Sequence, residues 1–245
     1  MTKNLNPQEQ RLSVAAPLGF DAQAIPVYEV CSNQPKVAAH VLEPLGLRDR
    51  FENPPAWEPE ITDENRHVIA ADIINKRQAA GKVTRAAVLV PLLLKRDGLS
   101  VLLTQRTDHL HDHAGQISFP GGRMDPGESD PNDTALRESE EEIGLDRRSV
   151  EIIGHLPQYL TVSGYSVTPV VGLVKPQAEY VLDAFEVADV FEVPLRFLMD
   201  PVNHQVRLWE SDQGSRRFYS MPYENRFIWG ATAGMLRNLY HLLKV

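Results

Sequence analysis

A short acidic helix, predicted over residues 131–143, constrains this chain more than any other feature because both of its ends are marked. Asp130 can cap the N-terminus, and Pro131 suits the first helical position. Asp133 then places a negative charge at the positive end of the helix dipole. Gly144 stands where a glycine commonly ends a helix. The sequence therefore predicts a helix of defined length and register.

The register of this helix gathers carboxylates on one face. At about 100° per residue, Glu141 and Glu142 lie within about 60° of Glu138. Three neighbouring carboxylates repel one another, and each pair lowers helix stability by a few tenths of a kcal/mol. A hard divalent cation such as Mg²⁺ or Mn²⁺ relieves this repulsion because it prefers carboxylate oxygens.

A run of glutamates, such as residues 140–142, is often only a solvated helix surface. The segment before the helix argues against that interpretation here. Gly121 and Gly122 allow the backbone to approach a ligand closely, and a carbonyl there could complete a metal shell. They belong to a long loop, residues 107–130, and long loops inside compact domains are often functional. The combination favours a catalytic metal site.

Apolar segments on both sides of this helix predict a mixed α/β fold. Apolar runs at 86–94 and 99–106 predict adjacent buried strands joined by a tight turn. Further strands are predicted at 150–156, 166–174 and 189–197, and a terminal helix at 231–243. Strands on both sides of a central helix favour a mixed sheet with helices on its faces.

The first third of the chain has weaker patterns. Short helices are predicted at 37–51 and 69–80, and a linker or wrapping segment at 53–66, which is rich in proline and charge. We therefore divide the chain into an N-terminal extension of undefined role, residues 1–83, and a catalytic domain, residues 84–245.

The composition limits the partners and the compartment. A net charge of −8 disfavours a nucleic-acid partner, because an acidic surface repels the phosphate backbone. Cys31 is the single cysteine, so no internal disulfide can form, and no Cys/His cluster has zinc spacing. No apolar run reaches the roughly 18 residues of a membrane helix, and the polar N-terminus lacks a signal core. We expect a cytoplasmic protein without a membrane partner; a homo-oligomer remains open.

The acidic helix and the loop before it resemble the Nudix box, G-x5-E-x7-R-E-U-x-E-E-x-G-U, where U is bulky and apolar. The matching residues, in order, are Gly122, Glu128, Arg137, Glu138, Glu141, Glu142, Gly144 and Leu145. Two departures occur. Eight residues instead of seven separate Glu128 from Arg137, and Ser139 replaces an apolar residue.

This resemblance implies a Nudix-type α/β/α sandwich with a central mixed sheet and a hydrolase that cuts a diphosphate. It also implies that Glu138, Glu141 and Glu142 bind Mg²⁺ or Mn²⁺, that one of them can act as the base, and that Arg137 orients them. A later loop often supplies a further acid in this family. Glu186 is the candidate, with Asp183 and Asp189 as alternatives.

The preceding segment, residues 102–122, resembles the motif LLTxR-(S/A)-x3-R-x3-G-x3-FPGG of the coenzyme A diphosphatase branch. The matching residues are Leu102, Leu103, Thr104, Arg106, Gly115, Phe119, Pro120, Gly121 and Gly122. Thr107 is a mild change, whereas His111 stands where the motif has arginine. Arg106, Gly115, Phe119, Gly121 and Gly122 are therefore the predicted substrate contacts, with His111 as a weaker candidate.

By this resemblance the substrate is coenzyme A or acyl-coenzyme A. Another diphosphate, such as ADP-ribose or NADH, is the alternative within the family, and a non-catalytic ligand sensor is the alternative outside enzymes. The alternating His109, His111 and His113 could be metal ligands, but solvated loop histidines fit their position better. Other segments of the chain also resemble this branch, and they supply further candidate contacts: Tyr165, Tyr223, Arg226 and Trp229.

Overall fold

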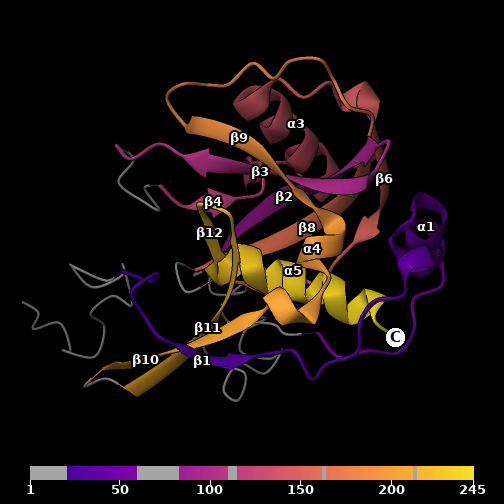
Figure 1. Ribbon diagram of the computed structural model, residues 1–245. Coiled ribbons are helices and arrows are strands. Elements are labelled where there is room, and N and C mark those ends of the chain that lie inside the picture. Colours follow the sequence, from indigo (N-terminus) through magenta and orange to yellow (C-terminus); the bar gives the residue numbers. More distant parts are fainter. Residues whose placement is uncertain (1–20, 60–82, 110–114, 162–163, 212–213) are drawn as a thin grey trace, which may run out of the picture.

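The computed structural model describes residues 21–59, 83–109, 115–161, 164–211 and 214–245. Its largest element is a mixed eight-stranded sheet, ordered β4-β3-β2-β8-β6, in which β5 pairs with β2, β7 with β8, and β9 with β3 (Figure 1). These strands are β2 (Thr84–Lys95), β3 (Gly98–Arg106), β4 (Ile117–Ser118), β5 (Gly121–Arg123), β6 (Val150–His155), β7 (Tyr159–Leu160), β8 (Tyr165–Val174) and β9 (Val187–Pro194).

The centre of this sheet is the parallel pair of β2 and β8, and the other pairings within it are antiparallel. Both strands are apolar along most of their length because both faces of the sheet are covered. Side chains of β2 alternate between the faces. Ala87, Leu89 and Leu93 join one core cluster, and Ala86, Val90 and Leu92 join the other.

Helices cover the two faces of this sheet. Helix α3 (Pro131–Ile143) packs against β2, β5 and β8 over the smaller core cluster, which includes Ala135 and Ile143. Helix α5 (Gly230–Leu243) lies on the opposite side and contributes Leu236 and Leu239 to the larger cluster (Figure 1). The predicted α/β/α sandwich with a mixed sheet is confirmed.

A second sheet was not predicted. It has four antiparallel strands, ordered β1-β10-β11-β12, and it extends below α5 in Figure 1. The strands are β1 (Val27–Val30), β10 (Gln205–Ser211), β11 (Gly214–Tyr223) and β12 (Arg226–Trp229). Strand β1 brings the beginning of the described chain beside a strand that lies some 180 residues later, and no local pattern can predict such a pairing.

Two predicted elements have wrong bounds, and prolines explain both. The helix predicted at 37–51 is split into a 3-10 turn, η2 (Ala39–Leu42), and α1 (Pro44–Glu52), because Pro44 fits only the first turn of a helix. The strand predicted at 189–197 ends with Pro194, after which α4 (Leu195–Leu198) begins. The helix predicted at 69–80 lies outside the described residues.

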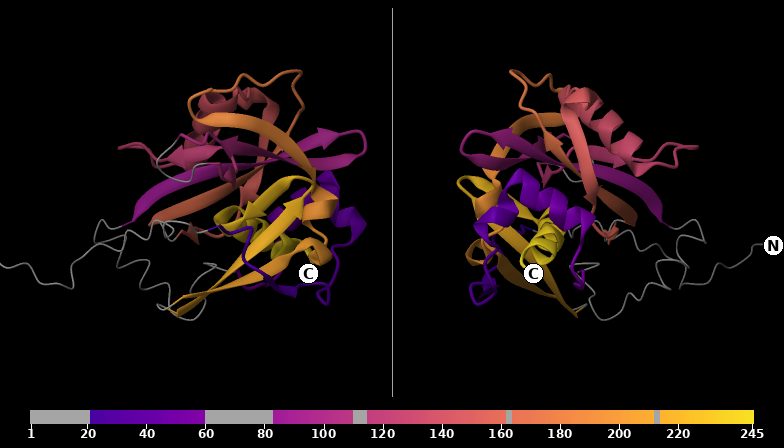
Figure 2. Two further views of the ribbon diagram at one scale, coloured as in Figure 1. Left: turned by 60° about the vertical axis from the view of Figure 1, so that its left-hand side comes forward. Right: turned by 90° about the vertical axis from the view of Figure 1, so that its right-hand side faces the viewer.

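The described part of the N-terminal segment packs on α5 and β6. Helix α1 lies beside α5 and β6, as the right-hand view of Figure 2 shows. Arg48 donates to both carboxylate oxygens of Glu151 at 2.7 Å, and the Phe51 ring lies against Gly154. The division at residue 83 stays a prediction. None of the described helices has the length and apolarity required to cross a bilayer.

Three short turns complete the order of elements. They are η3 (Arg147–Ser149) before β6, and α4 and then η4 (Pro201–Asn203) between β9 and β10. The last two turns connect β9, in the eight-stranded sheet, to β10, in the second sheet.

Candidate active site

The ends of α3 are those that the sequence predicted. The Asp130 side chain accepts a hydrogen bond from the backbone N–H of Asn132 at 2.9 Å, and Pro131 is the first helical residue. Gly144 ends the helix in the left-handed conformation, with φ of 64°. These ends fix which side of α3 faces Gly121 and Gly122 of β5.

Glu142 is the most deeply buried carboxylate of the helix, with 6% of its surface exposed. Its Oε2 atom accepts the backbone N–H of Gly121 at 3.1 Å. Burial raises the pKa of Glu142 to about 8, against the opposing effects of this hydrogen bond and of Arg106. A carboxylate in this position is costly to ionise unless a cation accompanies it.

Glu138 lies one turn before Glu142 and faces Gly122. A Cβ atom on Gly122 would stand 2.6 Å from the Glu138 Cδ atom and 2.7 Å or less from both oxygens. The absence of a side chain at position 122 therefore makes room for this carboxylate. Burial raises the pKa of Glu138 above its ordinary value, while the neighbouring Arg137 lowers it.

Arg137 connects the carboxylates of this region. Its guanidinium lies 2.9 Å from Glu138 Oε1 and donates to Glu141 Oε2 at 3.1 Å. It also donates to both oxygens of Glu128, at 3.0 and 3.3 Å. Glu141 is the most open of the group, with 60% of its side chain exposed. Arg137 therefore holds acidic groups from the helix and from the preceding loop together.

Glu128 binds the arginine and the helix start. In addition to Arg137, its carboxylate accepts the Thr134 hydroxyl and the backbone N–H of Asp125, both at 2.8 Å. The hydrogen bond from Arg137 and these two donors lower the pKa of Glu128 to about 2. The extra residue between Glu128 and Arg137 thus still allows the two side chains to meet.

Ser139, the other departure from the Nudix box, is fully buried on the inner side of α3. Its hydroxyl donates to the carbonyl of Ala135 one turn earlier, at 2.7 Å. The helix backbone therefore satisfies the polar atom, so a serine is accommodated where the motif has an apolar residue.

Arg106 and Glu186 bring two further charges to the carboxylate face. Arg106 ends β3, and its Nη1 atom lies 3.9 Å from Glu186 Oε2. The Arg106 cation lowers the pKa of Glu142, whereas the Glu186 anion raises the pKa of Glu142 and of Glu138. The charges at the end of β3 and just before β9 thus act on the carboxylates of α3.

The alternatives to Glu186 have other partners. The Asp183 carboxylate accepts the backbone N–H of Phe185 at 2.8 Å. Asp189 binds the guanidinium of Arg226, which also donates to Gln105 and lies over the Phe191 ring. Among the three acids proposed for this loop, Glu186 raises the pKa of both Glu138 and Glu142. Its predicted catalytic role stays a prediction.

Sequence reasoning missed the segment that positions Glu186. Residues 177–186, here called the strap, run along the C-terminal end of α3. The Val181 and Asp183 N–H groups donate to the carbonyls of Ile143 and Glu142, at 3.1 and 2.9 Å. The Gln177 side chain donates to the Gly144 carbonyl at 3.1 Å. The strap thereby satisfies helix carbonyls that have no partner within the helix.

The other predicted substrate contacts differ in their burial and in their neighbours. Phe119 is buried in the core cluster that α5 covers, and Gly115 has φ of 68° beside the Asp108 carboxylate. Arg123 donates to the Tyr165 hydroxyl at 3.2 Å. His111 and His113 lie outside the described residues. Substrate contacts by Phe119, Gly115 and Tyr165 stay predictions.

The donor set suits a hard divalent cation. Glu138 and Glu142 supply oxygen atoms only, and burial raises the pKa of both carboxylates, so a cation would favour their ionised form. Within the described residues, no three acidic or imidazole side chains are gathered closely enough to hold a cation as they stand. Glu141 is bonded to Arg137, so its participation requires rotation of its side chain.

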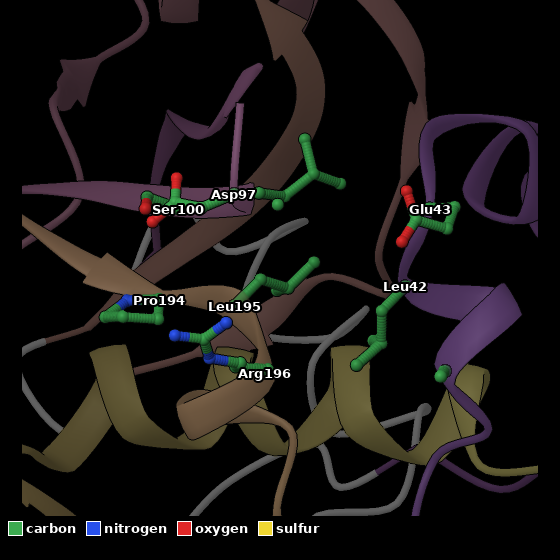
Figure 3. Close-up of a pocket in the computed structure, with 10 residues that line it drawn as sticks. Leu42, Glu43, Asp97, Ser100, Pro194, Leu195 and Arg196 are labelled. Atoms are coloured by element: carbon green, nitrogen blue, oxygen red, sulfur yellow. The ribbon is translucent and has the colours of Figure 1, made fainter. Parts of the chain in front are cut away.

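A separate hollow of about 180 Å³ lies at the other end of β3 and β9. Figure 3 shows Glu43, Asp97, Ser100 and Arg196 around it. The six residue-to-residue steps from Ser100 to Arg106 span about 20 Å along β3, at roughly 3.3 Å per step. This hollow is therefore remote from the carboxylates, and we place the candidate active site at α3 on the strength of its chemistry.

Comparisons with known proteins identify the family of this chain. The NUDIX domain model matches residues 83–214. Proteins described as "Uncharacterized Nudix hydrolase NudL", from Yersinia pestis (strain Pestoides F) and Yersinia pseudotuberculosis serotype O:1b, are 41% identical over 155 residues, which cover 63% of this chain and 77% of each relative.

Solved structures give more distant matches. The crystal structure of RenU, a Nudix hydrolase from M. smegmatis, is 23% identical and covers 46% of this chain and 71% of RenU, with a TM-score of 0.40. The extent of the family match and the identity to the NudL proteins together show that the chain belongs to the Nudix hydrolase family.

Proposed function

We propose that this protein hydrolyses the diphosphate bond of coenzyme A and acyl-coenzyme A, with a divalent cation. The products are 4′-phosphopantetheine, or its acyl form, and adenosine 3′,5′-bisphosphate. The observation that carries the metal-dependent hydrolysis is the position of Arg106 and Glu186 at the buried Glu142, which accepts the backbone N–H of Gly121 in β5.

The reaction needs charge neutralisation more than covalent chemistry. Bound Mg²⁺ or Mn²⁺ would supply polarisation of the phosphoryl oxygens and a lower pKa for water. Glu138 and Glu142 would hold the cation, with Glu141 available after rotation. Arg137 orients Glu138, and Glu128 in turn orients Arg137. Arg106 binds a phosphate oxygen with a permanent positive charge.

Glu186 is the proposed general base. Its side chain is 45% exposed, so water can reach it, and Arg106 holds it near the carboxylates of α3. The water oxygen forms a bond to one phosphorus, the bridging P–O bond breaks, and the proton of the water passes to the Glu186 carboxylate. The departing phosphate keeps the electron pair of the broken bond.

The choice of coenzyme A comes from the motif at residues 102–122. This substrate carries a 3′-phosphate beyond the diphosphate, so recognition needs a cationic contact outside the metal site. Arg106 is engaged at the diphosphate, so His111 is the candidate for this contact. It carries a positive charge only when it is protonated, with an ordinary pKa near 6.5. We therefore expect the variant His111→Arg to bind coenzyme A more tightly than the wild type at pH 8, with a smaller difference near pH 6.

A panel of diphosphates tests the substrate. The protein is incubated with Mg²⁺ and, separately, coenzyme A, dephospho-coenzyme A, ADP-ribose and NADH, and the products are identified by mass spectrometry. We expect the highest kcat/KM for coenzyme A and a lower value for dephospho-coenzyme A. Equal values for these two would contradict the 3′-phosphate contact. Cleavage of ADP-ribose or NADH with coenzyme A left intact would contradict the branch assignment, and no turnover of any diphosphate would favour a ligand sensor.

A further inference from the structure

An exposed aromatic pair lies beside the candidate active site. Phe185 belongs to the strap, and 65% of its surface is exposed. Its ring stands edge-to-face against the imidazole of His109, with centroids 4.9 Å apart and an angle of 61° between the planes. A large apolar ring left in water loses the free energy that burial would provide, so this pair is a surface that a ligand can cover favourably.

The backbone on both sides of Phe185 is fixed. Its N–H donates to Asp183 Oδ1 at 2.8 Å, and its carbonyl accepts the Thr107 hydroxyl at 2.7 Å. The next carbonyl, of Glu186, accepts the Thr107 N–H at 3.0 Å. The strap and the end of β3 are thus joined at Thr107, and the ring is presented from a rigid position. A ligand that contacts a preorganised ring loses less conformational freedom on binding.

The pair adjoins the phosphate-binding charges on both strands. Phe185 immediately precedes Glu186, and His109 follows Arg106 by three residues, while Arg106 and Glu186 themselves lie 3.9 Å apart. A diphosphate held at Arg106 and the carboxylates of α3 would therefore leave the group attached to it within reach of Phe185. A flat π system covers such a ring more completely than an aliphatic amide chain does.

We propose that Phe185, supported by His109, stacks on the nucleobase of the substrate and is thus a specificity-determining residue. This inference rests on the proposed function, since it concerns the nucleotide half of the same diphosphate. The aliphatic half of the substrate lies away from the pair. Stacking of one base on one aromatic side chain typically changes affinity by about fivefold to more than a hundredfold.

Calorimetric binding of adenosine 5′-monophosphate and ribose 5-phosphate tests the proposal, because ribose 5-phosphate has a C1 hydroxyl in place of the base. Both are measured on the full chain with Mg²⁺, and neither contains a diphosphate. We expect the wild type to bind adenosine 5′-monophosphate more tightly. Phe185→Ala should weaken this binding about tenfold and leave ribose 5-phosphate within about twofold, whereas Phe185→Trp should restore it.

Val181→Ala is the matched control, since Val181 is an exposed apolar residue of the same strap. It should leave both dissociation constants unchanged. Equal affinity of the wild type for the two probes, or equal weakening of both by Phe185→Ala, would overturn the stacking role. Because the assay needs no turnover, it distinguishes this failure from failure of the proposed function, which the diphosphate panel decides.

Discussion

Among single residues, Glu142 combines burial and negative charge most strongly. Its register on α3 was predictable from the spacing of the glutamates, because helical periodicity places it beside Glu138. Its burial was not predictable, since that depends on Gly121 of β5 and on the strap, which lie far from it in sequence. The raised pKa of Glu142 is therefore a property of the assembled fold.

This pKa predicts that cation binding releases a proton. The pKa of Glu142 is about 8 without a cation, so the group is mostly protonated at pH 7 and must lose its proton to bind metal. We expect the apparent affinity for Mn²⁺ to rise as the pH increases from 6 to 8 and to level off above that. Calorimetry in buffers of different ionisation enthalpy measures the released proton, which should be absent in Glu142→Gln. Binding at pH 7 without proton release would contradict this assignment.

Substitution of each of the two adjacent glycines by alanine should have a different effect, on stability at Gly121 and on activity at Gly122. At Gly121, with φ of 151°, a Cβ atom would lie 2.4 Å from the Ala87 carbonyl oxygen, so Gly121→Ala strains backbone against backbone. At Gly122 the same atom would displace only the flexible Glu138 carboxylate. We expect Gly121→Ala to lower the unfolding free energy by about 2 kcal/mol or more.

Gly122→Ala should instead reduce kcat/KM at least tenfold while the melting temperature changes by only a few degrees. Thermal unfolding and steady-state kinetics of both variants provide the comparison. A loss of stability in Gly122→Ala as large as that in Gly121→Ala would refute the idea that position 122 is kept open for the carboxylate.

Whole elements differ in how far local sequence determines them. The bounds of α3 follow from Asp130, Pro131 and Gly144, because capping is local chemistry. The strap has no such signal. Its backbone hydrogen bonds to the end of α3 depend on the path of the chain, which local sequence does not determine. The one local signal of a functional segment was a large apolar residue, Phe185, in a polar loop between two strands.

The strap predicts a positioning role for Asp183. Its backbone N–H binds the Glu142 carbonyl, and its carboxylate shapes the turn that leads to Glu186. Asp183→Ala removes the side-chain acceptor, so we expect kcat to fall about tenfold and KM to change less. Asp183→Asn keeps an oxygen acceptor and should retain kcat within about threefold.

Glu179→Ala is the control for this experiment, because Glu179 is an exposed acid on the same strap. It should behave like the wild type in steady-state kinetics. Equal kcat values for Asp183→Ala and the wild type would show that the turn does not position the base.

On the scale of the whole molecule, a buried arginine joins the N-terminal segment to α5. Arg237 is 1% exposed, donates to Gln34 Oε1 at 3.0 Å and to His204 Nδ1 at 2.9 Å, and lies over the Tyr240 ring. The Tyr240 hydroxyl donates to the Pro35 carbonyl at 2.6 Å. Local patterns in the first third of the chain could not indicate these long-range contacts, so the sequence left that segment without a role.

His204 predicts how stability responds to acid. Burial lowers its pKa to about 4, and the nearby Arg237 and His241 act in the same direction, while the Leu198 carbonyl and Asp200 oppose them. The unfolded chain thus takes up a proton below about pH 6.5 that the folded chain refuses until about pH 4. Stability from this group is present above pH 6.5 and is lost as the pH falls through this window, by up to about 3 kcal/mol.

Chemical denaturation of the wild type and of His204→Gln between pH 7 and pH 4 measures this contribution. Glutamine does not titrate, so the variant should be less stable at pH 7 and should show a shallower loss with acid. His40→Gln, at an exposed histidine, should keep the slope of the wild type. An unchanged slope in His204→Gln would refute the assignment.

The most direct test of the central claim is the turnover of coenzyme A by the wild type, Glu142→Gln and Glu140→Gln, with Mg²⁺ and with excess chelator. Glu140 is the matched control, since it belongs to the same helix and pairs with Arg147 at the exposed surface. We predict 4′-phosphopantetheine and adenosine 3′,5′-bisphosphate from the wild type and Glu140→Gln with Mg²⁺, none in chelator, and a loss of at least a hundredfold, about 2.7 kcal/mol, in Glu142→Gln. Full turnover in chelator, or equal rates for the two variants, would contradict a metal-dependent reaction at this face of α3.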